Sequence, residues 1–68
     1  MDLNAVPPEL LGIIMASTIS DDDKSAINNF FANLDEARRP EIMREIRSRG
    51  NWQDKIKYCL EQARAATV

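Results

Sequence analysis

Residues 20–34 read SDDDKSAINNFFANL, and this stretch decides the fold. Four large apolar residues recur in it at the i, i+3, i+4 and i+7 spacing of one helical stripe: Ile27, Phe30, Phe31 and Leu34. The Ser20 hydroxyl can accept from the free amides of a first helical turn, and the three aspartates that follow favour the positive end of a helix dipole. We therefore expect an amphipathic helix whose two aromatic rings form the middle of a core. Its asparagines are expected in solvent: Asn28, Asn29 and Asn33.

The sequence contains three further helix-start signals, each just before a stretch with helical periodicity. Proline suits the first turn of a helix because its missing N–H has no intrahelical partner there, and asparagine is a favoured N-cap. The fold class is therefore all-α, a compact bundle of four short helices, since no strand alternation or repeat is present. The expected helices span 8–17, 21–34, 40–48 and 52–65.

The connections carry expectations of their own. Asp35 either caps a short turn, or the second helix continues to Arg38. Arg39 precedes a proline, which favours an extended backbone and a break in the helix. Gly50 is placed to close the third helix in the left-handed conformation. The three links are short enough to force neighbouring helices into contact.

A chain of 68 residues with 44% apolar side chains suits one folded domain, expected over residues 7–68 behind a frayed segment at 1–6. It has no histidine and one cysteine, so the usual zinc ligands and a histidine base are absent. The adjacent Asp21, Asp22 and Asp23 fit helix capping rather than a calcium loop. We expect no enzyme, no metal, no cofactor and no small-molecule substrate.

The single Cys59 cannot form an intramolecular disulfide, and the longest apolar run is far shorter than the roughly 20 residues that cross a bilayer. No membrane segment is expected. A reducing compartment is expected instead, either the cytoplasm or the nucleus.

The helix expected over 8–17 is apolar around about 200° of its circumference, which is wider than the stripe of an ordinary surface helix. Two interpretations follow. The helix lies centrally and is covered by the others, or Leu11 and Met15 form a surplus face that docks a partner or a second copy of the chain.

The last helix carries one apolar stripe, which comprises Trp52, Ile56, Cys59, Leu60 and Ala63. Trp52 is expected to cover the core. Tyr58 is expected on the solvent side of this stripe, either as a contact residue for a partner or lying flat along its neighbours.

Charge is divided along the chain. Residues 1–36 contain seven acidic side chains and one lysine, whereas residues 37–68 contain eight basic and four acidic ones. The two halves should attract each other. Four arginines could contact phosphates or an acidic partner, or could pair internally with the Asp-rich turn: Arg38, Arg39, Arg44 and Arg47.

The sequence contains no catalytic or ligand signature. It favours a small non-enzymatic interaction module, regulatory or adaptor in role, that binds a protein partner through Leu11 and Met15, with Tyr58 as a further candidate contact. A homodimer through the same face is the close variant. The alternative is a small nucleic-acid-associated regulator that uses the four arginines, whose binding would weaken steeply with salt.

Overall fold

The computed structural model describes residues 1–66 and shows an all-α bundle, as the sequence predicts. Its helices are α1 (Pro8–Ala16), α2 (Asp21–Ala32), α3 (Arg39–Ser48) and α4 (Trp52–Ala66). Every helix begins within one residue of the expected position and ends within two. Residues 67 and 68, which belong to the expected domain 7–68, lie outside the described residues.

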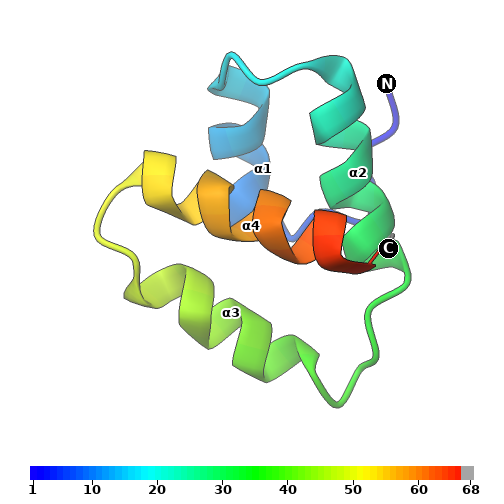
Figure 1. The fold of residues 1–68 in the computed structure, drawn as a ribbon, viewed down its shortest axis with the longest axis vertical. Coiled ribbons are helices and arrows are strands. Elements are labelled where there is room, and N and C mark those ends of the chain that lie inside the picture. Colours follow the sequence, from blue (N-terminus) through cyan, green and yellow to red (C-terminus); the bar gives the residue numbers. More distant parts are fainter. Residues whose placement is uncertain (67–68) are drawn as a thin grey trace.

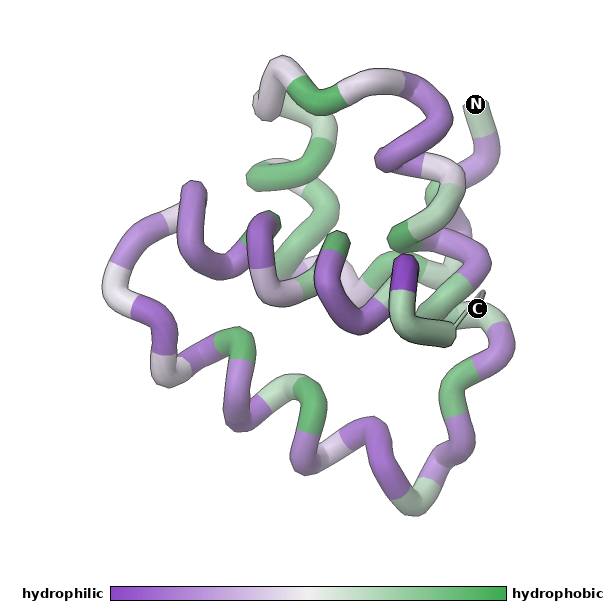
Figure 2. Tube along the Cα trace, viewed as in Figure 1, coloured by the Kyte–Doolittle hydropathy of each residue, from purple (hydrophilic) through white to green (hydrophobic). Residues whose placement is uncertain are grey.

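Helix α4 occupies the centre of the arrangement. Figure 1 shows α1 and α2 joined at one end, α4 crossing both, and α3 lying along the other side of α4. Helix α4 packs against each of the other three helices. One interpretation of the sequence placed α1 at the centre because its apolar residues spread widely around the helix. Figure 2 shows α1 as mostly hydrophobic. That interpretation is wrong, because α4 is the helix that the others share.

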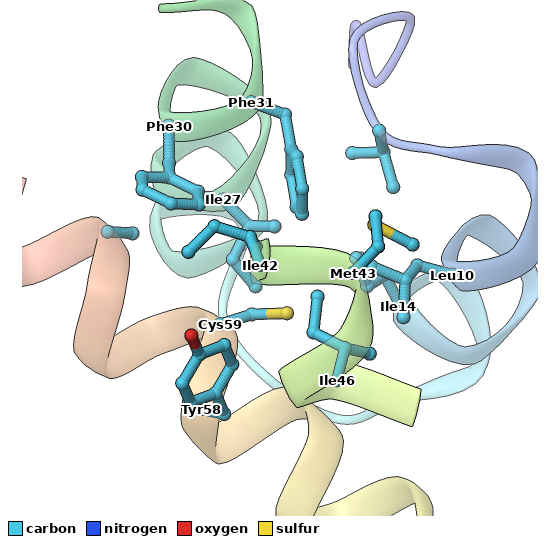
Figure 3. Packing of buried hydrophobic residues seen from close by; sticks show 12 residues of the cluster. Leu10, Ile14, Ile27, Phe30, Phe31, Ile42, Met43, Ile46, Tyr58 and Cys59 are labelled. Carbon is cyan, nitrogen blue, oxygen red and sulfur yellow. The ribbon is translucent and has the colours of Figure 1, made fainter. Parts of the chain in front are cut away.

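The core forms where all four helices converge. Figure 3 shows Phe30 and Phe31 of α2 facing side chains of α1, α3 and α4. The two rings meet edge to face, with centroids 5.2 Å apart, and the side chain of Phe31 is 1% exposed. The main apolar residues around them are Leu10, Ile14, Ile27, Ile42, Met43, Ile46 and Cys59. Leu34 is only partly buried at the edge of this cluster.

Helix starts follow the predicted capping chemistry. The Ser20 hydroxyl accepts from the Asp23 amide at 3.1 Å, and the Asn51 side-chain oxygen accepts from the Asp54 amide at 2.9 Å. Of the two alternatives for Asp35, the short turn is correct, because its carboxylate accepts from the Ala37 amide at 3.1 Å. The turn carries the chain directly into α3, so Arg39 is its first helical residue and not an extended break.

Helix α3 ends differently from the expectation. Gly50 does not adopt a left-handed conformation, and Arg49 follows the helix with an extended backbone. Lys55 of α4 supplies the missing donors, because its ammonium donates to the carbonyl oxygens of Ile46 at 3.0 Å and Arg49 at 2.7 Å. The guanidinium of Arg49 donates to the Glu45 carbonyl oxygen at 2.8 Å. Two cationic side chains thus satisfy carbonyls that a left-handed glycine would otherwise help to satisfy.

The first six residues, expected to fray, pack against α2. Val6 is buried in the core, and Leu3 packs against it. The side-chain oxygen of Asn28 accepts from the Ala5 amide at 2.9 Å, and Asn28 is buried rather than solvated as expected. This hydrogen bond gives a segment without helical periodicity a fixed place, and the sequence pattern alone does not indicate it.

Opposite charges from the two halves of the chain meet, as expected from their composition. Glu9 and Arg47 form a two-pronged ion pair at 2.5 and 2.9 Å between α1 and α3. This pairing holds the pKa of the Glu9 carboxyl below its usual value, chiefly through the hydrogen bonds from Arg47. Asp23 pairs with Arg64, which joins the first turn of α2 to the last turn of α4.

Candidate functional site

The surplus apolar face expected on α1 is reduced to one side chain. Leu11 is partly buried and packs against the core, whereas Met15 is 62% exposed. A single exposed methionine is ordinary on a protein surface and does not make a patch. The structure therefore does not bring Leu11 and Met15 together as one exposed surface.

Tyr58 is buried and does not lie on the solvent side of α4, so the prediction of an exposed contact residue is wrong and the ring lies along its neighbours instead. Its ring lies under the guanidinium of Arg49, whose central carbon is 4.1 Å from the ring centroid, a cation–π arrangement. Burial and the nearby Glu45 carboxylate raise the pKa of the phenol. The error arose because the apolar stripe of α4 is rotated: α4 turns Tyr58, Cys59 and Ala63 inward and leaves Trp52 48% exposed.

The four arginines do not form one free cationic patch. Arg47 is engaged with Glu9, and Arg39 lies 3.8 Å from the Glu36 carboxylate and donates to the Phe31 carbonyl oxygen at 3.5 Å. Arg44 is exposed on α3, and Arg38 borders a groove beside α2. The Asp-rich turn takes its partner from Arg64 instead of from these four.

An apolar groove of about 510 Å³ runs along α4, where Trp52 is exposed and Leu60 is partly buried, while Ile56 between them is buried. Trp52, Ile56 and Leu60 recur every fourth residue and so follow one another along a single side of the helix. Ile19, from the link between α1 and α2, forms the opposite wall. The lining surface is almost wholly apolar, which distinguishes this groove from the charged surface around it.

Charged and polar side chains border the groove along α4. Gln53, Lys57 and Glu61 are exposed and follow the apolar row at the same spacing. Arg64 lies at the C-terminal end of the groove, where its guanidinium pairs with Asp23. The groove is therefore an apolar strip with a polar rim, which is the usual composition of a protein-binding surface.

A second groove, of about 610 Å³, lies between α2, the end of α4 and the link that precedes α3. Phe30 and Leu34 contribute apolar surface to it, and Asp22, Asp35 and Arg38 contribute charges of both signs. Unlike the groove along α4, it offers no continuous apolar strip, and its charges are of both signs. It therefore selects no particular ligand chemistry.

Within residues 1–66, no three histidine, cysteine, aspartate or glutamate side chains are grouped so as to hold a metal ion. Cys59 is enclosed in the core, and burial raises the pKa of its thiol to about 11. A thiol with this pKa is almost entirely protonated near neutral pH and is a poor nucleophile. In the same part of the chain, no helix combines the length and apolar character needed to span a bilayer.

Sequence reasoning missed the groove although every lining residue was visible. Ile19 is a lone apolar residue in a polar link, and a single residue carries no periodicity. Trp52 fits the core stripe of α4 by spacing, yet it stands in the first turn of that helix. Its position at the end of the stripe was the available signal, because terminal turns extend beyond the neighbouring helices.

The groove thus stands as the candidate site on its geometry. Comparisons of this chain with protein-family models, curated proteins and solved structures find no match.

Proposed function

We propose that this chain is a non-enzymatic protein-interaction module that binds its partner in the groove formed by Ile19, Trp52, Ile56 and Leu60. The observation that carries the proposal is Trp52, a 48% exposed indole that lines an almost wholly apolar groove. Tryptophan is enriched among the residues that dominate binding energy at protein interfaces. Its large ring also presents much contact area with little conformational entropy to lose.

The form of the groove favours a polypeptide over a small molecule. From residue 52 to residue 64 it follows α4 for roughly 18 Å, which is about three helical turns. One helix and a single loop residue supply its lining, so it is open along one side. Small-molecule sites usually enclose most of their ligand, whereas an open apolar strip suits a row of side chains from another chain. A small-molecule substrate therefore has no place in this proposal.

The nucleic-acid alternative receives less support. Phosphate binding needs cationic groups free to replace counterions, and Arg39 and Arg47 already have acidic partners within the chain. A protein partner in a reducing compartment, such as the cytoplasm, is consistent with a buried, protonated Cys59.

Selection of displayed peptides tests the proposal and needs no identified partner. A library of short peptides is selected on the wild-type chain, and each binder is measured against Trp52→Ala and Met15→Ala. Both residues are exposed and apolar, so the two variants remove similar surface at different places. We expect binders to lose about tenfold or more in affinity for Trp52→Ala, in line with a tryptophan that dominates binding at an interface, and to keep their affinity for Met15→Ala.

Chemical-shift mapping of the bound peptides gives the second readout. The amide signals that move should come from Ile19 and from Trp52 to Leu60. Binders that depend on Met15 and leave the signals of α4 unchanged would refute the groove and restore the α1 face. Binders that are released by moderate salt and compete with DNA or RNA would favour the arginine-based alternative.

A further inference from the structure

We infer that residues 1–6 form a detachable strap, and that the site beneath this strap binds a short non-helical segment of another protein when the strap opens. The strap is then an intramolecular occupant that keeps the site closed. The site includes Asn28 and shares no residue with the groove along α4, so it goes beyond the proposed function. The strap itself shows which chemistry the site accepts.

Few interactions hold the strap to the helices. Val6 is its buried side chain, while Leu3 and Ala5 are partly buried against the core. Within the described residues, one hydrogen bond joins the strap to the rest of the chain, from the Ala5 amide to Asn28, and no ion pair does. Segments with few buried contacts and few hydrogen bonds open at a lower free energy than the core. The strap should therefore open while the helices stay folded.

Helix α1 does not depend on the strap for its first turn. The Pro7 carbonyl oxygen closes that turn by accepting from the amides of Leu10 at 2.9 Å and Leu11 at 3.1 Å. Neither Pro7 nor Pro8 has an N–H, so the junction with the strap has no donor to leave unpaired when the strap opens. Helix α1 also packs directly against α4. These contacts keep α1 in place without residues 1–6.

The site beneath the strap recognises a backbone group and a side chain together. Asn28 is a buried polar side chain on α2, and its oxygen accepts from the Ala5 amide at 2.9 Å. The next residue, Val6, places its side chain in the apolar core. When the strap opens, the Asn28 oxygen loses its donor and apolar surface meets water, and both changes favour a replacement occupant. A free backbone amide followed by a valine-sized aliphatic residue meets both requirements.

The strap also forms a turn of its own, which a separate segment can reproduce. The Val6 amide donates to the Leu3 carbonyl oxygen at 3.1 Å, and the Asp2 carboxylate accepts from the Asn4 amide at 2.8 Å. Both hydrogen bonds lie within residues 1–6, so they do not need the rest of the chain. The partner that fits is therefore a turn-forming segment, and a helix does not fit because its amides are already bonded within it.

A peptide of residues 1–8, with the sequence MDLNAVPP, tests this site when it is titrated into isotope-labelled full-length chains. The wild-type chain holds its own strap at the site at a high effective concentration, which opposes the peptide. Val6→Ser weakens the strap and keeps the chain at full length. This variant should bind the peptide about tenfold or more tightly than wild type does, because its site is open for a larger fraction of the time. The amide signals around Asn28 should move towards their wild-type positions.

Four controls locate the binding. A peptide that carries Val6→Ser should not bind the Val6→Ser chain. Met15→Ala, which removes an exposed apolar side chain outside the strap, should treat the peptide as wild type does. Adding Asn28→Ala to Val6→Ser should abolish peptide binding, since the acceptor for the backbone amide is gone. Adding Trp52→Ala to Val6→Ser should leave the binding unchanged, which separates this site from the groove along α4.

Three outcomes would overturn the inference. Loss of the helical circular dichroism of Val6→Ser would show that the strap is part of the core and does not detach. A folded Val6→Ser chain that binds no peptide at about 1 mM would show that the site accepts no separate segment. Equal binding by wild type and Val6→Ser would place the peptide elsewhere on the molecule. None of these results changes the test of the groove, which depends on Trp52 and not on the strap.

Discussion

The two sides of α4 differ in how completely they are covered, although both carry large apolar side chains. On one side Cys59 is 1% exposed and Tyr58 is buried beneath Arg49. On the other side Trp52 is 48% exposed above an open groove. The side chains differ little in apolar character, so hydrophobicity does not explain the contrast. What differs is the surface that the rest of the chain offers to each side.

Helices α2 and α3 supply the cover on the closed side, with Phe30, Phe31, Ile42 and Ile46 among the residues that fill the space (Figure 3). On the groove side the link between α1 and α2 supplies only Ile19. A chain this short buries a smaller share of its surface than a larger domain does. In this chain, the surface that stays uncovered is the groove along α4.

The largest loss of stability should follow from removing a large side chain on the closed side of α4. Phe31→Ala removes a 1% exposed ring and its edge-to-face contact with Phe30. Phenylalanine-to-alanine changes in cores cost about 3 to 5 kcal/mol, which approaches the whole stability of a small domain. Urea denaturation followed by circular dichroism should show a chain that is largely unfolded, or close to it, at room temperature. A loss below about 1 kcal/mol would mean that α2 does not cover this side as described.

The second-largest loss of stability should come from the N-terminal segment, which packs against α2. Asn28→Ala leaves the Ala5 amide without its acceptor and should cost about 1 to 2 kcal/mol. Asn29→Ala, at an exposed position in the same helix, is the control and should change stability by less than about 0.5 kcal/mol. Amide exchange at Ala5 and Val6 should accelerate in the first variant alone. Equal behaviour of the two variants would show that the segment frays.

The third test measures how stability depends on pH, which reports whether Cys59 is buried on the closed side of α4. Burial raises the pKa of the Cys59 thiol from 9.0 to about 11, while the neighbouring Arg49 lowers it to a smaller extent. Well below pH 9 the thiol is protonated in the folded and unfolded chains, so its contribution to stability is constant. As the pH rises through 9 the unfolded thiol ionises while the folded one stays protonated, so stability should fall as pH rises towards 11, by about 1 kcal/mol at about pH 10.

A cysteine-free variant isolates this effect. Tyr58 also has a raised pKa and contributes in the same direction, so the slope of stability against pH is compared between wild type and Cys59→Ala. The slope between pH 9 and 11 should be shallower in the variant. Thiol labelling at about pH 8 should be slow in the native chain and fast in urea. Rapid labelling without denaturant would show that this side is open.

The smallest effect on stability is expected on the groove side. Trp52→Ala removes an exposed ring, and it should change the free energy of unfolding by less than about 1 kcal/mol, far less than Phe31→Ala. Denaturation curves of the monomer, measured at low micromolar concentration, make the comparison. A cost similar to that of Phe31→Ala would mean that the groove residues belong to the core and are not free to bind a partner.

Sequence periodicity predicted the helices well because each stretch has its own start signal. Ser20 and Asn51 cap the helices that they precede, and these caps are local, so short-range reasoning finds them. Three of the four residues of the predicted stripe were also placed correctly, since Ile27, Phe30 and Phe31 are buried, whereas Leu34 is only partly buried. Local chemistry thus accounts for nearly all of the secondary structure.

Properties that depend on neighbouring elements were not predictable in this way. The spacing of Trp52 and Tyr58 describes two sides of α4, but the positions of α2 and α3 decide which side is buried. Gly50 resembles a left-handed helix terminus until Lys55 is seen to satisfy the carbonyl of Ile46. The candidate site belongs to this second class, because Ile19 meets α4 only in the folded chain.

The contact from Lys55 to the end of α3 has a consequence for how the molecule opens. Its ammonium holds two carbonyl oxygens across the corner between α3 and α4, so neither helix end can loosen alone. Amide exchange in the last turn of α3 and the first turns of α4 should therefore proceed through one shared opening event, with a single free energy. In Lys55→Met the two segments should separate, with α3 exchanging first. The two hydrogen bonds from Lys55 thus make these two short helices open as a single cooperative unit.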